Sequence, residues 1–126
     1  MSLVNSERLR LIRQFAETAL DLEAAKEDIR HECRVWLAES ATRSRSYKDD
    51  ETFSKVARII DLEARVLAKV ADEHRLLAVR VFRLVQRRLG QLDAATCRRI
   101  FEGGPSRRQF IDRVVQHMYT ICQTDT

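Results

Sequence analysis

Apolar residues recur every three or four positions along two long stretches of the chain. In the first stretch, over about residues 6–39, the repeating positions are Ile12, Phe15, Ala19, Leu22, Ile29, Cys33 and Trp36. In the second, over about residues 50–89, they are Phe53, Val56, Ile60, Leu67, Val70, Leu77, Val81 and Leu84. Steps of three and four place these side chains on one face of an α-helix. The pattern predicts two long helices, and the second is expected to be continuous because residues 49–89 contain no glycine or proline.

Two shorter helices are predicted in the last third of the chain. Gly90 suits the position that follows a helix, and Asp93 can cap a helix over about residues 94–102. The Gly-Gly-Pro sequence at 103–105 ends that helix, and Ser106 can cap a last one, over about residues 106–123. The apolar face of the last helix is wide, which predicts that other helices cover it. It contains Phe110, Ile111, Val114, Val115, Met118, Ile121 and Cys122.

Together these elements predict an all-α fold, a helical bundle made of a long antiparallel coiled-coil-like hairpin and two short C-terminal helices. The long helices carry matching heptads and are joined by a polar stretch over residues 40–48. The two short helices are expected to fold back beside the start of the first helix. Three glycines and one proline leave little material for the turns of a β-sandwich or an α/β fold. A length of 126 residues suits a single domain over residues 1–126.

Three polar residues occupy positions within the apolar stripes: Lys26 in the first, and Glu63 and His74 in the second. Lys26 and Glu63 lie at similar distances from the connection between the helices, so we expect them to pair across the seam or within a dimer. Polar residues at such positions can fix helix register or oligomeric state at a cost in stability. His74 is either a hydrogen-bonded histidine of the core or edge, or a group whose protonation loosens the seam.

The open end of the hairpin is the predicted self-association surface. Alanines recur at steps of seven on the second long helix, at Ala57, Ala64, Ala71 and Ala78, and small residues allow helices to approach closely. This row could receive the first helix or a second copy of the chain. No other helix is expected to cover the open end, which predicts a homodimer formed through Trp36, Phe53, Ala57 and Ala64.

Positive charge is concentrated in the C-terminal part of the chain. The net charge of +4 divides into −2 for residues 1–73 and +6 for residues 74–126, where all ten basic residues are arginines. A basic surface suits a polyanion such as nucleic acid. The residues expected to contact phosphates are Arg83, Arg87, Arg88, Arg98, Arg99, Arg107 and Arg108, with Arg43, Arg45 and Lys48 of the connection as further contacts. Two other interpretations stay open, namely solvated arginine faces and a surface for an acidic protein.

Candidate catalytic and metal-binding residues do not form a recognisable site. Cys33 and Cys122 fall on apolar stripes without an adjacent base, and the glycines at 103–104 lack the lysine of a phosphate-binding loop. Asp28 and His31 form a single Asp-x-x-His pair, whereas di-metal bundles use two Glu-x-x-His pairs. We therefore expect no enzyme activity, no metal, no cofactor and no small-molecule substrate.

The expected compartment is the reducing cytoplasm. The three cysteines have no metal-type spacing, and an odd number suits free thiols better than a disulfide framework. The first residues lack the apolar segment of a signal peptide, and no apolar run is long enough to predict a membrane span.

Residues 87–106 resemble the central part of phage-repressor-type helix-turn-helix domains. The residues that carry the similarity are Leu89, Gly90, Thr96, Arg98, Arg99, Glu102 and Gly103. In that family the short helix enters the DNA major groove, so the resemblance implies that Thr96, Arg98 and Arg99 lie near bases or phosphates. The chain departs from the family in two ways: the turn after Gly90 is one residue longer, and the preceding helix is expected to be much longer.

As a whole, the sequence predicts a non-catalytic helical assembly or adaptor protein that acts through protein–protein contacts. Its arginine-rich C-terminal half is expected to contact nucleic acid, as a subunit of a ribonucleoprotein or an inhibitor of one. Such binding depends strongly on salt and little on sequence. The alternative is a dimeric helix-turn-helix-like DNA-binding regulator, and the third hypothesis is a bundle metalloenzyme. The sequence does not distinguish RNA, DNA and an acidic protein as the ligand.

Overall fold

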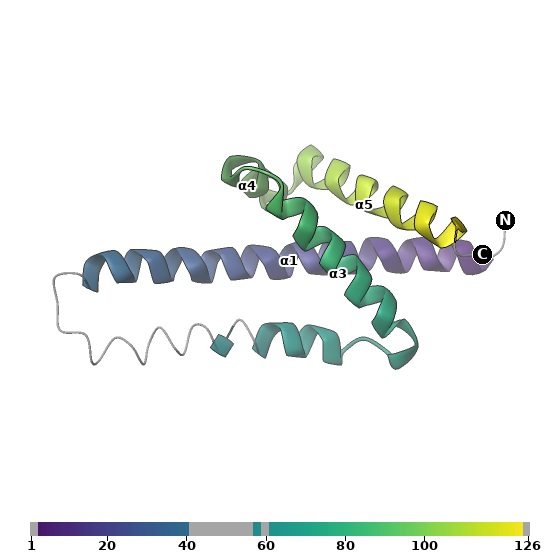
Figure 1. Ribbon diagram of the computed structural model, residues 1–126, viewed down its shortest axis with the longest axis horizontal. Helices are drawn as coiled ribbons and strands as arrows, with labels where there is room; N and C mark the ends of the chain where they lie inside the picture. Colours follow the sequence, from purple (N-terminus) through teal and green to yellow (C-terminus); the bar gives the residue numbers. More distant parts are fainter. Residues whose placement is uncertain (1–2, 41–56, 59–60, 125–126) are drawn as a thin grey trace. The chain divides into compact units, whose positions relative to one another are not determined.

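The computed structural model describes the backbone of residues 3–40, 57–58 and 61–124, and the side chains of residues 6–31, 34, 57–58 and 61–121. Within these ranges every regular element is helical, which confirms the all-α fold class. Residues 61–68 form a helical segment. The other elements, shown in Figure 1, are α1 (Leu3–Ser40), the short 3₁₀ helix η1 (Asp72–His74), α3 (Arg75–Gly90), α4 (Ala94–Glu102) and α5 (Gly104–Thr124).

The chain groups into two compact units. The first unit comprises residues 1–21 and 70–126, and the second comprises residues 22–69. The first unit therefore holds the start of α1 together with η1, α3, α4 and α5, whereas the second holds the rest of α1 and the helical residues 61–68. The single domain expected from the sequence stays a prediction.

The predicted ends of α4 are confirmed, and they follow from local chemistry. Asp93 is the N-cap residue, and its Oδ1 accepts a hydrogen bond from the Thr96 backbone N–H at 2.8 Å. Gly103 follows the helix with a φ of 104°, a conformation that glycine adopts without a steric penalty. The first and last predicted helices are also confirmed, α1 as Leu3–Ser40 and α5 as Gly104–Thr124.

The expectation of one continuous helix over about residues 50–89 is wrong. The helical residues 61–68 are followed by a turn at Lys69, and Ala71 is extended, with φ −57° and ψ 145°. The chain re-enters a helix through η1, and α3 begins at Arg75.

The break has a physical reason in the polar run over residues 72–74. Asp72 and Glu73 precede the N-terminus of α3, where the helix dipole favours negative charge. Arg75 lies 3.2 Å from the Asp72 carboxylate and donates a hydrogen bond to the Val70 carbonyl at 3.5 Å. Both interactions stabilise the non-helical conformation of the chain between residues 70 and 75. His74 is half-buried in η1 rather than placed in the seam of a continuous helix.

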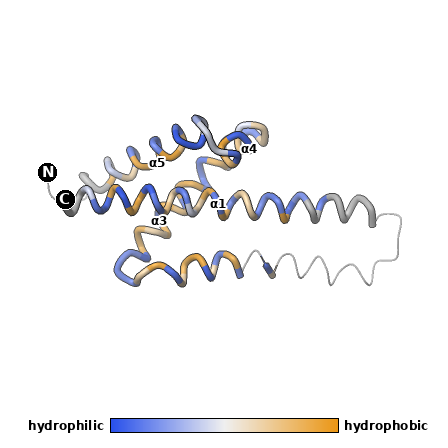
Figure 2. Tube along the Cα trace, turned by 180° about the vertical axis from the view of Figure 1, so that it is seen from behind, coloured by the Kyte–Doolittle hydropathy of each residue, from blue (hydrophilic) through white to orange (hydrophobic). Residues whose placement is uncertain are grey.

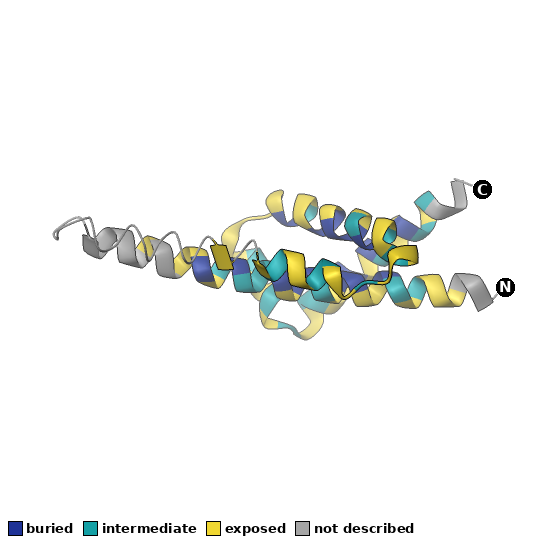
Figure 3. Ribbon diagram, turned by 90° about the horizontal axis from the view of Figure 1, so that it is seen from below, coloured by how far each residue is buried: buried dark blue, intermediate teal, exposed yellow. Residues whose placement is uncertain are grey.

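The core of the first unit comes from the inner faces of α1, α3, α4 and α5. The largest fully buried side chains in this unit are those of Ile12, Leu20, Val81, Val85 and Val114. Hydrophobic and hydrophilic stretches alternate along α3 and α5 (Figure 2), and α5 is buried along one edge and exposed along the other (Figure 3). The predicted stripe positions Phe15, Ala19, Leu84, Phe110, Ile111 and Met118 are also buried.

Two ion pairs fix the register between α5 and the first part of α1. Arg13 lies 2.8 Å from the Asp112 carboxylate, and Arg107 lies 3.0 Å from the Asp21 carboxylate. Residue numbers rise on one helix as they fall on the other, so the two helices run antiparallel. The expectation that the C-terminal part of the chain folds back on the start of the first helix is thus confirmed for α5 (Figure 1).

The second unit contains the predicted pairing of Lys26 with Glu63. The Lys26 side chain is 6% exposed, and its ammonium forms ion pairs with Glu63 and, at 2.9 Å, with Glu23 Oε2. Burial lowers the pKa of Lys26, but the hydrogen bonds and charges of Glu63 and Glu23 outweigh it, and the pKa is raised. The remainder of the predicted hairpin includes residues 41–56, outside the described residues, and stays a prediction.

A matched pair of leucine substitutions tests the assignment of core and surface. Leu20→Ala removes a side chain that is 0% exposed, and we expect the free energy of unfolding to fall by about 2–5 kcal/mol. Leu76→Ala makes the same chemical change at a site that is 67% exposed, and we expect a change within about 0.5 kcal/mol. Urea unfolding followed by circular dichroism measures both, and equal losses would contradict the assignment.

Substitutions at Lys26 test the buried ion pairs. Lys26→Leu leaves Glu23, whose side chain is 13% exposed, without a cation, and we expect a loss of about 1–3 kcal/mol in the free energy of unfolding. Lys26→Leu combined with Glu23→Leu is expected to recover most of that loss, because Glu63 is 42% exposed and stays solvated.

The same pairs predict a dependence on pH. Because the folded-state pKa of Lys26 is raised, its stabilising contribution is fully present below the ordinary lysine pKa and is lost as the pH rises through the folded-state value. We therefore expect the free energies of unfolding of wild type and Lys26→Leu to differ less above pH 10.5 than at neutral pH. Urea unfolding at the two pH values measures this difference. A difference that grew above that pH would contradict this account.

Candidate nucleic-acid interface

α3 presents a line of arginines on the side opposite its buried face. Arg80, Arg83 and Arg87 follow one another at steps of three and four, and all three are exposed. Leu76 lies one turn before Arg80 and is also exposed. At 100° per residue these four side chains fall within an arc of about 60° around the helix. We call Leu76, Arg80, Arg83 and Arg87 the α3 arginine face.

The guanidinium groups of the α3 arginine face are not neutralised within the described part of the chain. No carboxylate there forms an ion pair with Arg80, Arg83 or Arg87, whereas Arg13, Arg75 and Arg107 each have one. Each arginine offers up to five N–H donors in a planar arrangement that matches the oxygens of a phosphate. No ion pair with a described residue would therefore have to break before this face could meet a polyanion.

α4 carries two further exposed arginines, Arg98 and Arg99, beyond the end of α3. The Cys97 thiol donates a hydrogen bond to the Leu89 carbonyl at 3.3 Å, which connects α4 to the C-terminal end of α3. Ile100 of α4 is buried. Hydrogen bonds from Thr96 lower the pKa of Asp93, which keeps the N-cap carboxylate charged. Arg99 donates to the Thr96 hydroxyl at 3.2 Å.

The remaining arginines of the predicted set lie in different environments. Arg107 is half-buried between Asp21 and the Glu17 carbonyl, to which it donates at 3.4 Å, so it connects α5 to α1. Arg108 is exposed in the first turns of α5. Arg88 is half-buried on the flank of α3 that faces α5. The seven arginines therefore lie in different environments. Arg80 lies on the same face of α3 as Arg83 and Arg87, although the sequence did not single it out.

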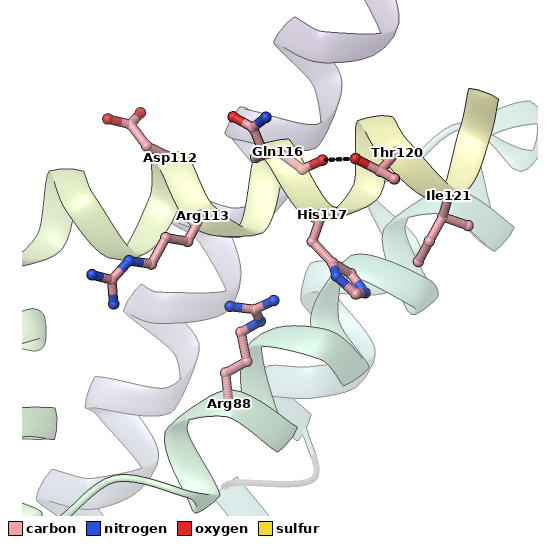
Figure 4. Close-up of a pocket in the computed structure, with 7 residues that line it drawn as sticks. All are labelled: Arg88, Asp112, Arg113, Gln116, His117, Thr120 and Ile121. Atoms are coloured by element: carbon pink, nitrogen blue, oxygen red, sulfur yellow. Dashed lines mark hydrogen bonds between the residues drawn. The ribbon is translucent and has the colours of Figure 1, made fainter. Parts of the chain in front are cut away.

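A cavity of about 470 Å³ lies between α3 and α5, and basic side chains from both helices line it. Figure 4 shows Arg88 extending from α3 toward α5 and His117 pointing from α5 back toward α3, while Arg113 leaves α5 beside them and extends away from His117. Asp112 and Gln116 also line the cavity but point to the other side of α5. Arg113 and His117 share a face of α5 because they are four residues apart, and this spacing was the sequence signal that could have identified them.

A second cavity, of about 340 Å³, lies between the start of α5 and α1. Its lining includes Arg13, Arg107 and Arg108, together with Glu17 and Asp112. Arg13 and Arg107 are each paired with a carboxylate, so most of the positive charge around this cavity is compensated.

The other predicted site residues divide between exposed positions and positions outside the description. Ala57 and Ala64 are exposed, and Ala78, the last residue of that row, is buried in the first unit. The structure does not describe the side chain of Trp36 or residues 41–56, which include Arg43, Arg45, Lys48 and Phe53. The homodimer stays a prediction.

The residues that resemble a helix-turn-helix domain differ in how far they are exposed to a DNA ligand. The helix before the turn is α3, which has 16 residues and is much shorter than the helix expected from the sequence. Arg98 and Arg99 are exposed, as a contact with DNA requires, but Thr96 is half-buried and takes part in the cap of α4.

Asp28 and His31, the residues of the single Asp-x-x-His pair, are both exposed, and no three His, Cys, Asp or Glu side chains converge among the described residues. No described helix is both long enough and apolar enough to cross a membrane.

No protein-family model, curated protein or solved structure matches the chain.

Asp93 substitutions test how α4 is positioned. Asp93→Ala removes the N-cap acceptor, and we expect a lower melting temperature and faster amide hydrogen exchange in α4. Asp93→Asn is expected to lose less, because asparagine also caps helices. The pKa of Asp93 is lowered in the fold, so its contribution is present above the ordinary aspartate pKa and lost as the pH falls through the folded-state value.

The matched control for this test is Glu102→Ala, which removes an exposed carboxylate from the other end of α4. Thermal unfolding measures each variant at neutral pH and near pH 3. If Asp93→Ala melted like Glu102→Ala at neutral pH, the capping role would be excluded.

Proposed function

We propose that this protein is a non-catalytic binding protein whose α3 arginine face contacts the phosphate backbone of a nucleic acid. The observation that carries the proposal is the line of three exposed arginines without a carboxylate partner among the described residues. The protein would act as an assembly or adaptor subunit of a ribonucleoprotein, or as an inhibitor of one. Its other helical faces would meet a protein partner.

The dimensions of the face suit a nucleic-acid backbone. Arg80 and Arg87 are seven residues apart, which corresponds to about 10 Å along α3. A DNA duplex carries one negative charge per roughly 1.7 Å of its axis, so a line of this length meets several phosphates whatever the sequence of bases. Such contacts provide affinity and position the protein, but they carry no sequence information.

Salt dependence gives the proposal a quantitative form. Each phosphate contact on duplex DNA contributes about −0.9 to the slope of log affinity against log salt. Three contacts from the α3 arginine face therefore predict a slope near −3, and binding should weaken roughly forty-fold between about 50 and about 200 mM salt. Contacts from Arg98 and Arg99 of α4 would steepen this slope.

The alternative function is DNA binding by a dimeric helix-turn-helix-like regulator. One observation favours it: the short helix α4 follows α3 directly and exposes Arg98 and Arg99. A regulator would prefer one palindromic duplex over random sequences, whereas phosphate contacts alone would not.

Paired double substitutions test the proposed function. Arg83→Gln with Arg87→Gln is expected to weaken binding to random-sequence duplex DNA and single-stranded RNA by at least about ten-fold at low salt, and to reduce the duplex salt slope by about 2. The control is Arg8→Gln with Arg10→Gln, which removes the same charge from exposed positions of α1 and should leave the slope unchanged. Fluorescence anisotropy at several salt concentrations measures both.

The outcomes separate the hypotheses. Equal losses in the two double variants would show that net charge, and not the α3 arginine face, causes the binding. No binding of wild type at low salt would exclude nucleic acid as the ligand and direct the search toward an acidic protein. Strong preference for one duplex sequence would favour the regulator.

A further inference from the structure

The cavity between α3 and α5 gathers basic groups that the proposed function does not use. Arg88 comes from α3, and Arg113 and His117 come from α5, so the fold brings together residues that are far apart in sequence. Arg88 follows Arg87 directly and is therefore turned by about 100° away from the α3 arginine face. A ligand in this cavity would be separate from a polyanion lying along that face.

The basic side chains around this cavity have no counter-charge among the described residues. Within the described parts of the chain, Arg88, Arg113 and His117 form no ion pair. The one carboxylate on the lining, that of Asp112, points to the other side of α5 and pairs with Arg13 at 2.8 Å. The second cavity shows the contrast, because Arg13 and Arg107 there are both paired with carboxylates.

Two guanidinium groups around one cavity repel each other, and arginine does not lose its charge in proteins. Arg88 is half-buried, which reduces the water available to screen its charge, whereas Arg113 and His117 are exposed. An anion placed between the two groups would convert this repulsion into attraction. The arrangement therefore favours an anionic ligand over a neutral one.

We propose that the cavity between α3 and α5 binds the phosphate group of a phosphate monoester through Arg88, Arg113 and His117. Two arginine side chains provide planar pairs of N–H donors for phosphate oxygens, and a neutral histidine still provides one N–H. The cavity is largely open to solvent, and its volume of about 470 Å³ leaves room for an organic group beyond the phosphate. Ile121 gives that organic group one apolar contact within the lining.

Other donors on the lining do not compete for this role. The Thr120 hydroxyl donates a hydrogen bond to the Gln116 carbonyl at 3.0 Å, so its proton is already used. The Gln116 side chain points away from Arg88 (Figure 4). Recognition of the phosphate thus depends on the three basic side chains, and loss of either arginine removes half of the fixed positive charge.

Two sources can present a phosphate monoester: a free phosphorylated small molecule and the 5′-phosphate at the end of a nucleic-acid strand. The first source does not depend on the proposed function, and the second extends it. The probes that distinguish them are inorganic phosphate, adenosine 5′-monophosphate, and a short oligonucleotide with and without a 5′-phosphate.

Titration of the full chain in about 150 mM sodium chloride, followed by calorimetry and by the amide resonances of α3 and α5, tests the proposal. We expect inorganic phosphate and adenosine monophosphate to shift amide resonances around Arg88, Arg113 and His117. Arg88→Gln and Arg113→Gln should each weaken adenosine monophosphate binding at least ten-fold. Arg113→Lys keeps the charge but loses the paired donors, so it should also weaken binding.

The matched control is Arg10→Gln, an exposed arginine of α1 outside the lining, which should bind adenosine monophosphate like wild type. Circular dichroism and thermal unfolding confirm that each variant is folded. Tighter binding of the 5′-phosphorylated oligonucleotide than of its 5′-hydroxyl form would identify the strand end as the source, and binding of adenosine monophosphate without that difference would identify a small molecule. The proposal is overturned if neither inorganic phosphate nor adenosine monophosphate binds at millimolar concentration, or if folded Arg88→Gln and Arg113→Gln variants bind like wild type.

Discussion

Burial of aliphatic side chains between α1, α3 and α5 is the interaction on which the rest of the first unit depends. Ile12, Leu20, Val81, Val85 and Val114 are fully buried there. Complete burial of such a side chain contributes about 1.5–3 kcal/mol, whereas an exposed ion pair contributes about 0–1 kcal/mol. Packing of the apolar faces therefore provides most of the stability. The ion pairs between α1 and α5 set the register in which the two antiparallel helices pack. The same packing decides which side of α3 remains available to a ligand.

The arginines of this unit fall into two groups, which differ in whether a carboxylate of the described residues lies within reach. Arg13 and Arg107 reach Asp112 and Asp21, so their charge is used within the fold. Arg80, Arg83 and Arg87 lie opposite the buried face of α3 and meet no carboxylate of the described residues. The second group could form ion pairs with a polyanion, as proposed, without breaking an ion pair to any described residue. This separation connects the packing of the core to the proposed binding of nucleic acid.

Local sequence patterns predicted most of the helices. The environment of each arginine depends on tertiary contacts, which local patterns do not reveal. The N-cap at Asp93 and the heptad slots of Lys26 and Glu63 could be read directly, because caps and helix faces depend on nearby residues. The break before α3 was missed although the acidic residues at 72–73 are a usual sign of a helix start, because the sequence has no glycine or proline there. Which arginines pair with a carboxylate of the described residues could not be predicted, since Arg107 and Asp21 are distant in sequence and meet only through the packing of α5 on α1.

The most direct test of the central claim is to observe the arginine side chains themselves during nucleic-acid binding. The Nε–H resonances of Arg80, Arg83 and Arg87 can be followed by NMR while random-sequence duplex DNA is added at low salt. The account predicts that these three resonances shift together, that those of Arg13 and Arg107 do not, and that raising the salt concentration reverses the change. Shifts confined to other arginines, or no shift at the α3 arginine face when the protein is saturated, would contradict it.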